Sequence, residues 1–461
     1  MPGAEIRRYA SARRGRTGAF LAGQLVGVLS SVANAVLQPV IVLPTLVLGF
    51  SDSWYLVVLP AVLAGVLWLA GAGLGALSLV RDRPGIWAIA GNLIRLLVVI
   101  ALAFVLDRNE QYSDDAVLRA VFVCFGLYVA GSAIASRASI EVASRTVPAA
   151  RRTSYFATRT FLGALAAIVV ALVAAALFAS ASLTFPAAYA VLFVVAAACL
   201  TVAAYFQSTV AVPASVATPS PPVPSANGQP GRGLSTYIGF RWLLAASALA
   251  DPFLVVYALR ELSASPGVIG LYVAALVAAR LLSEPLWARL ARRGRLRGGL
   301  QAVAVVRVLV PALALTLPRL YDASFWTDHV TNPDARGWVF GLVFVLIGIA
   351  QGGQARLNLP YLAEVASRNG RLARPLTNAV VAIAALAPLA GAWAYTRWGF
   401  DETLLVAAGA ALLGVLASGG LAVSSGVTRA VQGSWQLRRA GRPGPRIAPA
   451  PSASSWRRQQ T

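Results

Sequence analysis

Twelve apolar stretches separated by short polar connections make up most of this chain of 461 residues. Each stretch is close to the length of about 20 residues that an α-helix needs to cross the hydrocarbon core of a bilayer. About a quarter of the residues of a soluble protein are charged, whereas here 58% are hydrophobic and 12% are charged. The chain is therefore predicted to be an all-α membrane protein whose apolar surplus faces lipid.

The stretches form two groups of six, which predicts twelve transmembrane helices in two pseudo-symmetric six-helix bundles. The predicted helices are 19–48, 54–79, 86–106, 117–139, 158–180 and 186–211, then 236–261, 267–288, 299–318, 337–365, 376–396 and 403–426. The expected domains are a cytoplasmic tail (1–18), the first bundle (19–211), a Pro-rich cytoplasmic linker (212–235), the second bundle (236–426) and an Arg/Pro-rich cytoplasmic tail (427–461). The linker contains six Pro, a composition typical of an extended spacer.

Short motifs recur in the two halves at similar offsets. Residues 141–145 reappear unchanged as residues 364–368, each time at the end of an apolar stretch. The first stretch contains Gln38-Pro39, and the seventh contains Asp251-Pro252. Two Arg pairs twelve residues apart recur as well: Arg83 with Arg95, and Arg295 with Arg307. The halves are therefore predicted to be structural repeats, an organisation common among transporters that bind their solute between the repeats.

The distribution of Arg predicts the orientation in the membrane. All 39 basic residues are Arg, and 28 of them lie in the segments on one predicted side, against five in the loops on the other. Cytoplasmic loops carry such an excess, so both termini are predicted to face the cytoplasm in a multi-pass protein of the cytoplasmic membrane. The net charge of +22 then reflects orientation and anionic headgroups, and no nucleic-acid partner is expected.

Composition excludes several kinds of chemistry. Without Lys the chain has no Walker A loop and no Schiff-base chemistry. One His and two Cys, the latter inside apolar stretches, make a His/Cys metal site and a disulfide framework unexpected. We find no nucleophile–base pattern, so we expect neither an enzyme nor a cofactor.

The loop between the second and third predicted helices contains Asp82-Arg83-Pro84-Gly85. With the six-plus-six organisation and the central linker, this loop resembles the major facilitator superfamily, whose signature there runs Gly, three residues, Asp, Arg, one residue, Gly and two basic residues. Ser78 stands in place of the first Gly, and Ile86-Trp87 in place of the basic pair. Residues 285–295 resemble the same loop without its Asp.

The resemblance implies alternating access, in which two bundles rock about a central site without ATP hydrolysis. In that family, helices 1, 7 and 10 border the central cavity, and helices 3 and 9 lie toward the periphery. The implied function is secondary transport of a small solute.

Asp251 is the most informative polar residue inside a predicted span. It precedes Pro252 in helix 7, and its expected equivalent in helix 1 is Gln38. An unpaired carboxylate in a membrane favours its protonated form, which would suit proton coupling. The alternative is a permanent ion pair with Arg280 or Arg307.

Other polar residues are candidates for the same cavity. Arg280 and Glu284, four residues apart on one helix, share a face and are expected to pair with each other. In helix 10, Gln351, Gln354 and Arg356 surround two Gly residues, and either line the cavity or bond to neighbouring helices. The full candidate set for the solute or the coupling ion is Asn34, Gln38, Asp251, Arg280, Glu284, Gln351, Gln354 and Arg356.

Arg95 and Arg307 occupy matching places in helices 3 and 9, and we favour a structural role for both over solute binding. Arg119 and Arg241 lie near span ends, where their side chains can reach the membrane interface.

Acidic residues at the predicted cytoplasmic ends suggest a gate. Glu141 is expected to pair with Arg81 or Arg83, and Glu364 with Arg289, Arg292 or Arg293. The candidate gate residues are Asp82, Arg83, Glu141, Arg145, Arg289, Arg292, Glu364 and Arg368. Weak exposed pairs would suit a gate that opens, and the alternative is surface pairing without a gating role.

The sequence thus predicts a secondary active transporter of a small solute, with the proton as a candidate coupling ion. Its expected partners are the lipid bilayer and the solute, and we expect a monomer. A transport-inactive sensor or scaffold with the same architecture is the alternative, favoured by the missing Asp in the second loop motif.

Overall fold

The computed structural model of the chain describes residues 2–75, 80, 82–210, 232–321, 334–366 and 373–422. These residues are helical apart from short connections, and this part of the chain contains no β-strand. Most of the predicted linker and all of the predicted C-terminal tail lie outside the described residues.

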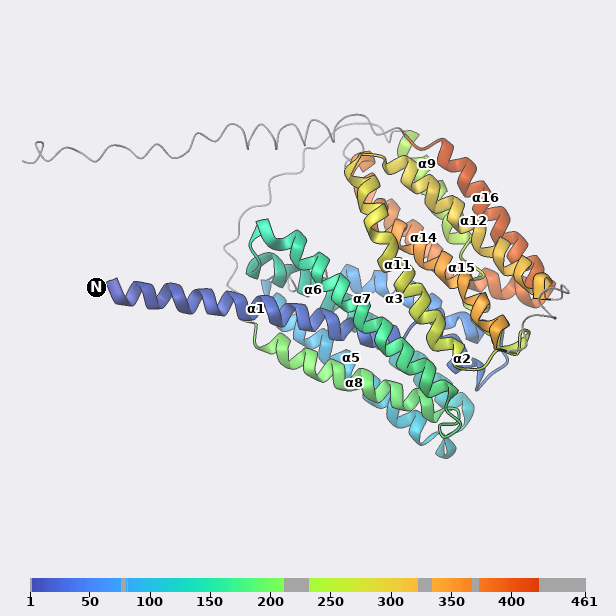
Figure 1. The fold of residues 1–461 in the computed structure, drawn as a ribbon, viewed down its shortest axis with the longest axis horizontal. Coiled ribbons are helices and arrows are strands. Elements are labelled where there is room, and N and C mark those ends of the chain that lie inside the picture. Colours follow the sequence, from blue (N-terminus) through green and yellow to red (C-terminus); the bar gives the residue numbers. More distant parts are fainter. Residues whose placement is uncertain are drawn as a thin grey trace, which may run out of the picture. The chain divides into compact units, whose positions relative to one another are not determined.

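Helices account for every predicted apolar stretch (Figure 1). The first half contains α1 (Pro2–Val36), α2 (Val42–Leu48), α3 (Trp54–Gly75), α5 (Pro84–Asp107), the short 3-10 helix η1 (Asn109–Gln111), α6 (Asp114–Thr146), α7 (Ala149–Ala179) and α8 (Ala187–Ser208). The second half contains α9 (Arg232–Ala246), α10 (Asp251–Arg260), α11 (Val268–Arg292), α12 (Leu296–Tyr321), α14 (Ala335–Ala366), α15 (Ala373–Trp398) and α16 (Phe400–Gly419).

The predicted all-α membrane class agrees with these helices. Within the described residues, nine helices are long and apolar enough to cross a membrane, and Phe20–Val36 and Trp54–Ala70 are shorter apolar helices. The count of twelve spans in two bundles stays a prediction. Several helices extend beyond the predicted spans: α1 begins at Pro2 and not at residue 19, α6 ends at Thr146 and not at residue 139, and α7 begins at Ala149 and not at residue 158.

The first and seventh predicted spans are each broken into two helices near the proline noted in the sequence. The first break, 37–41, contains Gln38-Pro39, and the second, 247–250, precedes Asp251-Pro252. Proline lacks a backbone N–H and clashes with the preceding turn, so it interrupts a helix but fits its first turn. Pro252 accordingly sits in the first turn of α10, and the Gln38 carbonyl accepts from the backbone N–H of both Val42 and Leu43 at 3.1 Å.

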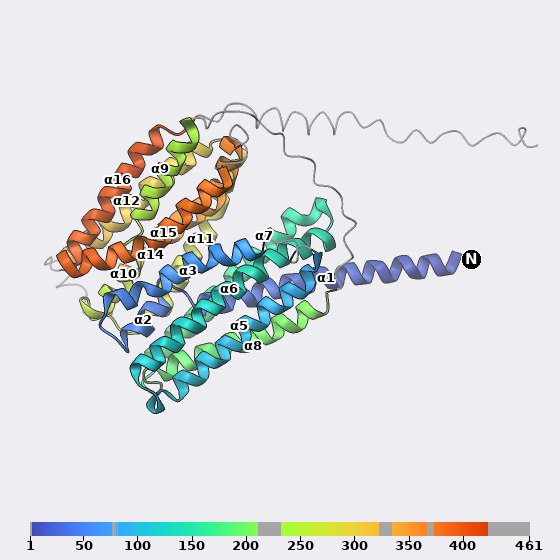
Figure 2. The same ribbon diagram turned by 180° about the vertical axis from the view of Figure 1, so that it is seen from behind.

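Contacts within each half are supplemented by two main helix pairs between the halves. In the first half α5 packs on α6 and α8, and α1 packs on α7 and α8; in the second, α14 packs on α11 and α12, and α16 on α9 and α12. Between the halves α3 packs on α15, and α7 on α11, as both ribbon views allow the reader to follow (Figures 1 and 2).

Small residues let α7 and α11 approach closely. A Cβ atom at Gly270 would collide with the backbone of Ala171 and Ala175. One turn earlier, a Cβ atom at Gly267 would lie 3.2 Å from the Cβ of Ala179. Without a hydrophobic driving force in lipid, helices associate through such close packing.

Among the residues whose burial the structure describes, the buried core runs across both halves at one end of the bundle. We call the end that carries Asp52 and Arg260 the Asp52 end, and the opposite end the Glu141 end. The largest buried cluster includes Val36 and Val170 from the first half together with Leu254 and Val273 from the second. Toward the Glu141 end, separate clusters occur in the second half (including Tyr237 and Leu300) and in the first half (including Val142 and Val210). The halves are therefore joined most extensively toward the Asp52 end.

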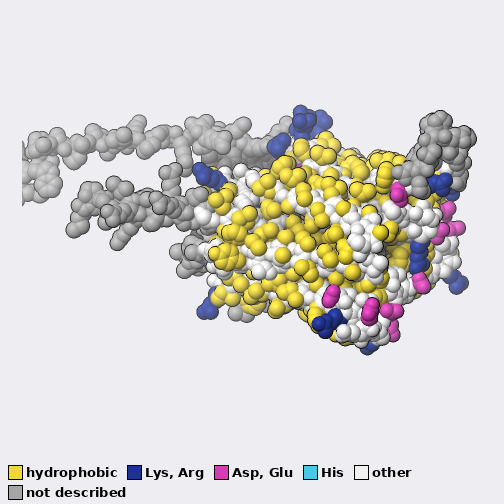
Figure 3. Space-filling view, turned by 60° about the horizontal axis from the view of Figure 1, so that its bottom comes forward, with side chains coloured by type: hydrophobic (Ala, Val, Ile, Leu, Met, Phe, Trp, Pro, Cys, Tyr) yellow, Lys and Arg dark blue, Asp and Glu magenta, His cyan; other side chains and the backbone are white. Residues whose placement is uncertain are grey.

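The outer surface suits a lipid environment. Figure 3 shows a broad area of hydrophobic side chains on one face, with Arg, Asp and Glu side chains toward its margins. The exposed large hydrophobic residues on α5, α7 and α8 include Leu97, Ile100, Phe104, Phe161, Leu165, Val169, Val194 and Val202. Such an extent of exposed apolar surface is not expected of a soluble monomer.

Replacing Gly270 with Leu is predicted to destabilise the joint between the halves. The new side chain would force α7 and α11 apart, and overpacking of this kind costs about 1–3 kcal/mol. The thermal unfolding midpoint of the purified protein in detergent should fall. Gly409→Leu on α16 is the matched control, because no atom lies within 4 Å of a Cβ placed there. Equal midpoints for the two variants would contradict the prediction.

Candidate functional site

Arg95 is buried inside the first half, where it joins three helices. Its side chain on α5 is 3% exposed. Nη1 donates to Ser30 Oγ (3.3 Å) and Asn92 Oδ1 (3.1 Å), while Nη2 donates to Asn34 Oδ1 (3.2 Å) and Tyr128 Oη (2.9 Å). The Tyr128 hydroxyl in turn donates to Asn34 Oδ1 at 2.7 Å. Arg95 thus ties α1 and α6 to α5, and in the described part of the chain no carboxylate pairs with it.

Arg307 plays the corresponding part in the second half, but its partner is charged. Its side chain on α12 is 2% exposed, and it forms a bidentate pair with Asp251 at 3.1 and 2.9 Å. It also donates to Ser247 Oγ (3.2 Å) and to the Ser247 carbonyl (2.8 Å). That carbonyl is available because the chain is broken there and the Asp251 N–H bonds to the Ala248 carbonyl instead.

The prolines suggested that Gln38 in the first half is equivalent to Asp251 in the second, but the contacts of the two buried Arg residues indicate a different residue. Ser30 and Asn34 are four residues apart and bind Arg95, as Ser247 and Asp251 are four apart and bind Arg307. By its contacts, Asn34 and not Gln38 corresponds to Asp251. The sequence analysis missed both Ser residues, although the shared spacing of Ser and a polar residue in helices 1 and 7 could have revealed them.

The pairing of Asp251 matches one of the alternatives left open by the sequence, namely an ion pair with Arg307. A bidentate guanidinium–carboxylate pair is geometrically specific as well as strong. Removing one partner of such a buried pair leaves an uncompensated charge. Both buried Arg residues therefore hold their own half together, in keeping with the structural role favoured for them.

A second polar group connects α9, α11 and α14. Glu284 on α11 lies 3.6 Å from Arg356 on α14, with side chains 42% and 46% exposed. Arg241 on α9 donates to Gln354 Oε1 on α14 at 3.2 Å. The expected pairing of Glu284 with Arg280 is therefore wrong for this structure: the spacing of four residues permits it, but α14 supplies a different cation. The role of Arg241 was missed, because its place near a span end favoured a surface position.

Arg280 is exposed, and the described residues form no ion pair with it. Gln351 is half-buried on α14, without a described side-chain hydrogen bond. The roles predicted for the candidate cavity residues as a set stay predictions.

At the Glu141 end, the structure differs in part from the expected gate pairs. Glu141 pairs with Arg145, one turn further along α6, at 3.0 Å. Arg83, one of its two expected partners, is exposed, as are Asp82, Arg289 and Arg292. Arg81 and Arg368 lie outside the described residues. The pairing of Glu364 with Arg289, Arg292 or Arg293 stays a prediction.

The contacts at the Asp52 end include a cluster that the sequence analysis did not identify. Arg260 of α10 pairs with Asp52 and lies over the ring of Trp54, 5.3 Å from its centroid. The Trp54 ring is 4.2 Å from that of Tyr395, which stacks on Phe253 at 5.1 Å. These residues come from both halves, so the cluster, which we call the Asp52-end latch, holds the halves together.

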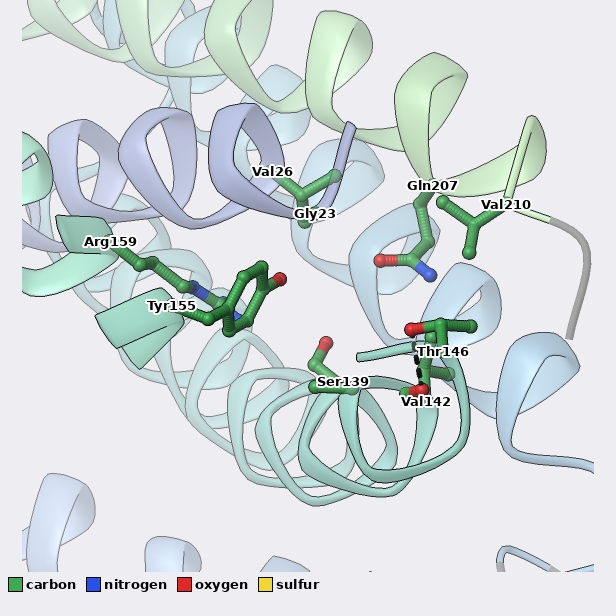
Figure 4. A pocket seen from close by; sticks show the side chains of 10 residues that line it. Gly23, Val26, Ser139, Val142, Thr146, Tyr155, Arg159, Gln207 and Val210 are labelled. Carbon is green, nitrogen blue, oxygen red and sulfur yellow. Dashed lines mark hydrogen bonds between the residues drawn. The ribbon is translucent and has the colours of Figure 1, made fainter. Parts of the chain in front are cut away.

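A small polar pocket lies within the first half, near Glu141. Side chains of α1, α6, α7 and α8 surround it, among them Ser139, Tyr155, Arg159 and Gln207 (Figure 4). Its free space is on the scale of a single water molecule, so it is too small for an organic solute. Gly23 and Gly27 of α1 leave the room that Tyr155 and Arg159 occupy.

The described residues do not gather three or more His, Cys, Asp or Glu side chains where a metal ion could be held. Hard divalent cations prefer several carboxylate or other oxygen ligands, whereas the polar groups described above contain more Arg than carboxylate.

A double-mutant cycle at Asp251 and Arg307 is predicted to be strongly non-additive. Asp251→Leu or Arg307→Met alone leaves one buried charged group unpaired, which costs about 3–5 kcal/mol. The double variant leaves no unpaired charge, and its unfolding midpoint should fall by much less than the sum of the single effects. The exposed pair of Arg319 and Asp401, 3.6 Å apart, is the control, with coupling of about 0–1 kcal/mol. Additive effects at Asp251 and Arg307 would show that the pair is not coupled.

Comparison with known proteins supports the fold. No family model matches the chain, and no curated protein matches it. A bacterial homologue of the iron transporter ferroportin, solved in an inward-facing state, has a TM-score of 0.62 at 15% identity, covering 88% of this chain and 98% of that one. The xylose transporter XylE from E. coli, in an inward open conformation, has a TM-score of 0.58 at 14% identity. The match covers 92% of this chain and 100% of that one. A bacterial metal transporter has a TM-score of 0.57 at 16% identity. The match covers 88% of this chain and 98% of that one. The three structures are of transporters, and the similarity shows that this chain shares their fold.

Proposed function

We propose that this protein is a secondary active transporter that moves a small solute across the cytoplasmic membrane by alternating access. The observation that carries the proposal is the uneven joining of the halves. Among the residues whose burial the structure describes, they share one buried core toward the Asp52 end and have separate cores toward the Glu141 end. Two repeats that rock about a site between them expose that site to one side of the membrane at a time.

The distribution of Arg supports a proposal for which end of the bundle faces the cytoplasm. With both termini cytoplasmic and twelve spans in two bundles, the Asp52 end is external and the Glu141 end is cytoplasmic. The present conformation then corresponds to a state that is closed to the outside and open to the cytoplasm. Two of the similar structures named above were solved in inward states.

The Asp52-end latch is weak enough to open in each transport cycle. In its ion pair the Asp52 side chain is 88% exposed and the Arg260 side chain is 37% exposed. Exposed pairs contribute about 0–1 kcal/mol. Each aromatic pair adds about 0.5–1.5 kcal/mol beyond its buried area. On the cytoplasmic side we propose that the charged ends of the two halves form the alternative closure. The residues in question are Asp82, Arg83, Glu141, Arg145, Arg289, Arg292, Glu364 and Arg368.

For proton coupling we propose Glu284 in place of Asp251. Asp251 is buried and held by two hydrogen bonds from Arg307, whereas Glu284 is 42% exposed and lies 3.6 Å from its partner Arg356. A carboxylate that must gain and lose a proton in each cycle needs access to water and a partner that it can release.

A disulfide across the external seam is predicted to stop transport. In a variant with Cys124 and Cys199 replaced by Ala, Cys at 179 and 267 would join α7 to α11, since the two Cβ atoms would lie 3.2 Å apart, close to disulfide geometry of about 3.5–4.5 Å. Uptake into proteoliposomes of labelled acetate, citrate, phosphate, xylose and Mn²⁺ should show flux that oxidation abolishes and reduction restores.

The matched control joins two helices of the same half. A Cβ at Gly233 would lie 3.3 Å from that of Ala422, and Cys at these positions should form a disulfide that leaves flux intact. Flux that survives oxidation of the 179–267 pair would contradict alternating access. No flux of any solute above that of protein-free vesicles would favour the alternative function, a transport-inactive sensor or scaffold.

Glu284→Gln is predicted to separate exchange from accumulation. The amide of Gln does not bind and release a proton, so accumulation driven by a pH gradient should be lost while exchange of solute across the membrane at equal pH continues. Both the accumulation and the exchange are measured with any labelled solute that the proteoliposome experiment shows to be transported. Asp251 cannot serve as a control because it holds Arg307, whereas Glu402→Gln at an exposed position of α16 can. Gradient-driven accumulation by Glu284→Gln equal to that of the unmodified protein would exclude Glu284 as the coupling group.

A further inference from the structure

The described spans contain more cationic side chains than carboxylates to pair with them. Arg307 pairs with Asp251, and Arg356 with Glu284. Of the remaining Arg residues deep in the spans, Arg95 and Arg241 bond to neutral groups, and Arg280 has no described partner. A charge inside a membrane is unfavourable unless it is paired or has access to water, and it commonly marks the path of a substrate.

Arg280 lies on the face of α11 that is turned toward the other half. Gly270 and Val273, earlier in α11, contact the first half, where they line an apolar pocket with residues of α1 and α7. Arg280 is seven residues after Val273 and Glu284 is fourteen after Gly270, so all four residues share one helix face. Leu282, on the opposite face, is 78% exposed, as expected of a lipid-facing side chain. Arg280 therefore lies on the side of α11 that faces the other half, beyond the point where the halves touch. It is at the edge of that side next to α14, where a Cβ atom at Gly352 would lie 3.6 Å from its Cγ.

The side-chain amide of Asn34 in the first half is a candidate hydrogen-bond donor to the same solute. The Oδ1 atom of Asn34 accepts from Arg95 and from Tyr128. Because a guanidinium can only donate, the carbonyl oxygen and not the amide nitrogen must face Arg95. The Asn34 amide nitrogen is thus directed away from this network. The residue is exposed, and no partner of that nitrogen occurs among the described residues. Two hydrogen bonds to Oδ1, one from a cation, further polarise the amide and strengthen its N–H groups as donors.

The spacing of the two groups suits a small organic molecule. Asn34 precedes Ala35, which lines the apolar pocket together with Val273. Arg280 is seven residues beyond Val273, a distance of about 10 Å along a helix. Along the axis of the bundle, the two groups are therefore separated by about the length of a small organic molecule.

We propose that the transported solute carries an oxyanion group, such as a carboxylate or a phosphate, which Arg280 binds while Asn34 donates a hydrogen bond to the solute from the other half. This inference rests on the proposed transport function and adds its substrate class. A neutral sugar would leave the charge of Arg280 uncompensated, and a divalent cation would be repelled by it. The two halves then differ: a carboxylate lies beside Arg307, whereas a neutral amide beside Arg95 adds no negative charge to the first half's side of the site.

The test measures binding and flux separately on the purified full chain. Acetate, citrate, benzoate and inorganic phosphate are the anionic probes, and xylose and Mn²⁺ are the neutral and cationic ones. At least one anion should raise the thermal unfolding midpoint. Arg280→Gln should weaken its binding by about 10-fold to 100-fold, as expected for the loss of a hydrogen bond to a charged group. Arg319→Gln, at an exposed position of α12, should bind normally.

Asn34→Asp provides a second variant that is expected to fold well. The new carboxylate can pair with Arg95, as Asp251 pairs with Arg307, so the midpoint without ligand should stay equal or rise. The added negative charge should nevertheless weaken anion binding, which a purely structural role of Asn34 would not explain.

The outcomes distinguish this inference from the transport proposal. Anion binding that depends on Arg280 without any flux would support the substrate class and contradict transport. Flux of xylose or Mn²⁺ that survives Arg280→Gln would support transport and overturn the substrate class. If none of the anions stabilises the protein, or if their effect persists in Arg280→Gln, the inference is wrong.

Discussion

The absence of water in the bilayer core is the constraint on which the rest of this structure depends. A guanidinium placed there must find hydrogen-bond acceptors in the protein or reach an aqueous cavity. Arg95 and Arg307 find them in the helix that begins each half, and these contacts hold α5 to α1 and α12 to the break between α9 and α10. The breaks in the first and seventh spans fit the same constraint, because non-helical backbone inside a membrane must be buried in protein or line a cavity.

Small residues and a few aromatic contacts then determine how the halves meet. Gly267 and Gly270 bring α11 against α7, and the rings of Trp54, Phe253 and Tyr395 pack across the seam near the Asp52 end. Each contact is modest, and none is a buried ion pair. Among the ion pairs of the described residues, the buried one, Arg307 with Asp251, lies within one half, whereas the one between the halves, Arg260 with Asp52, is exposed.

The buried Arg residues of the two halves have similar surroundings but partners of different charge. Asn34 occupies in the first half the place that Asp251 occupies in the second, relative to the buried Arg residues. The second half is thereby neutralised at its core, while Arg280 and Arg241 remain without carboxylates in the described spans. This inequality between the halves is the basis for assigning an anionic solute to the space between them.

The sequence by itself determined where the helices run, because a span needs a fixed length of apolar residues. The prolines of the first and seventh spans lie at breaks, whereas others, such as Pro60 and Pro311, lie inside continuous helices. The sequence also determined the repeat and the matching places of Arg95 and Arg307. Only the tertiary structure decided which side chains form the ion pairs and aromatic contacts. Residue spacing permitted Glu284 to pair with Arg280, and a shared predicted membrane side permitted Glu141 to pair with Arg83, yet Arg356 and Arg145 are the partners found. Trp54 and Tyr395 are hundreds of positions apart and give no sign in the sequence that they meet. Spacing along one helix limits which side chains share a face, but the packing of neighbouring helices selects which of the possible partners lies within reach.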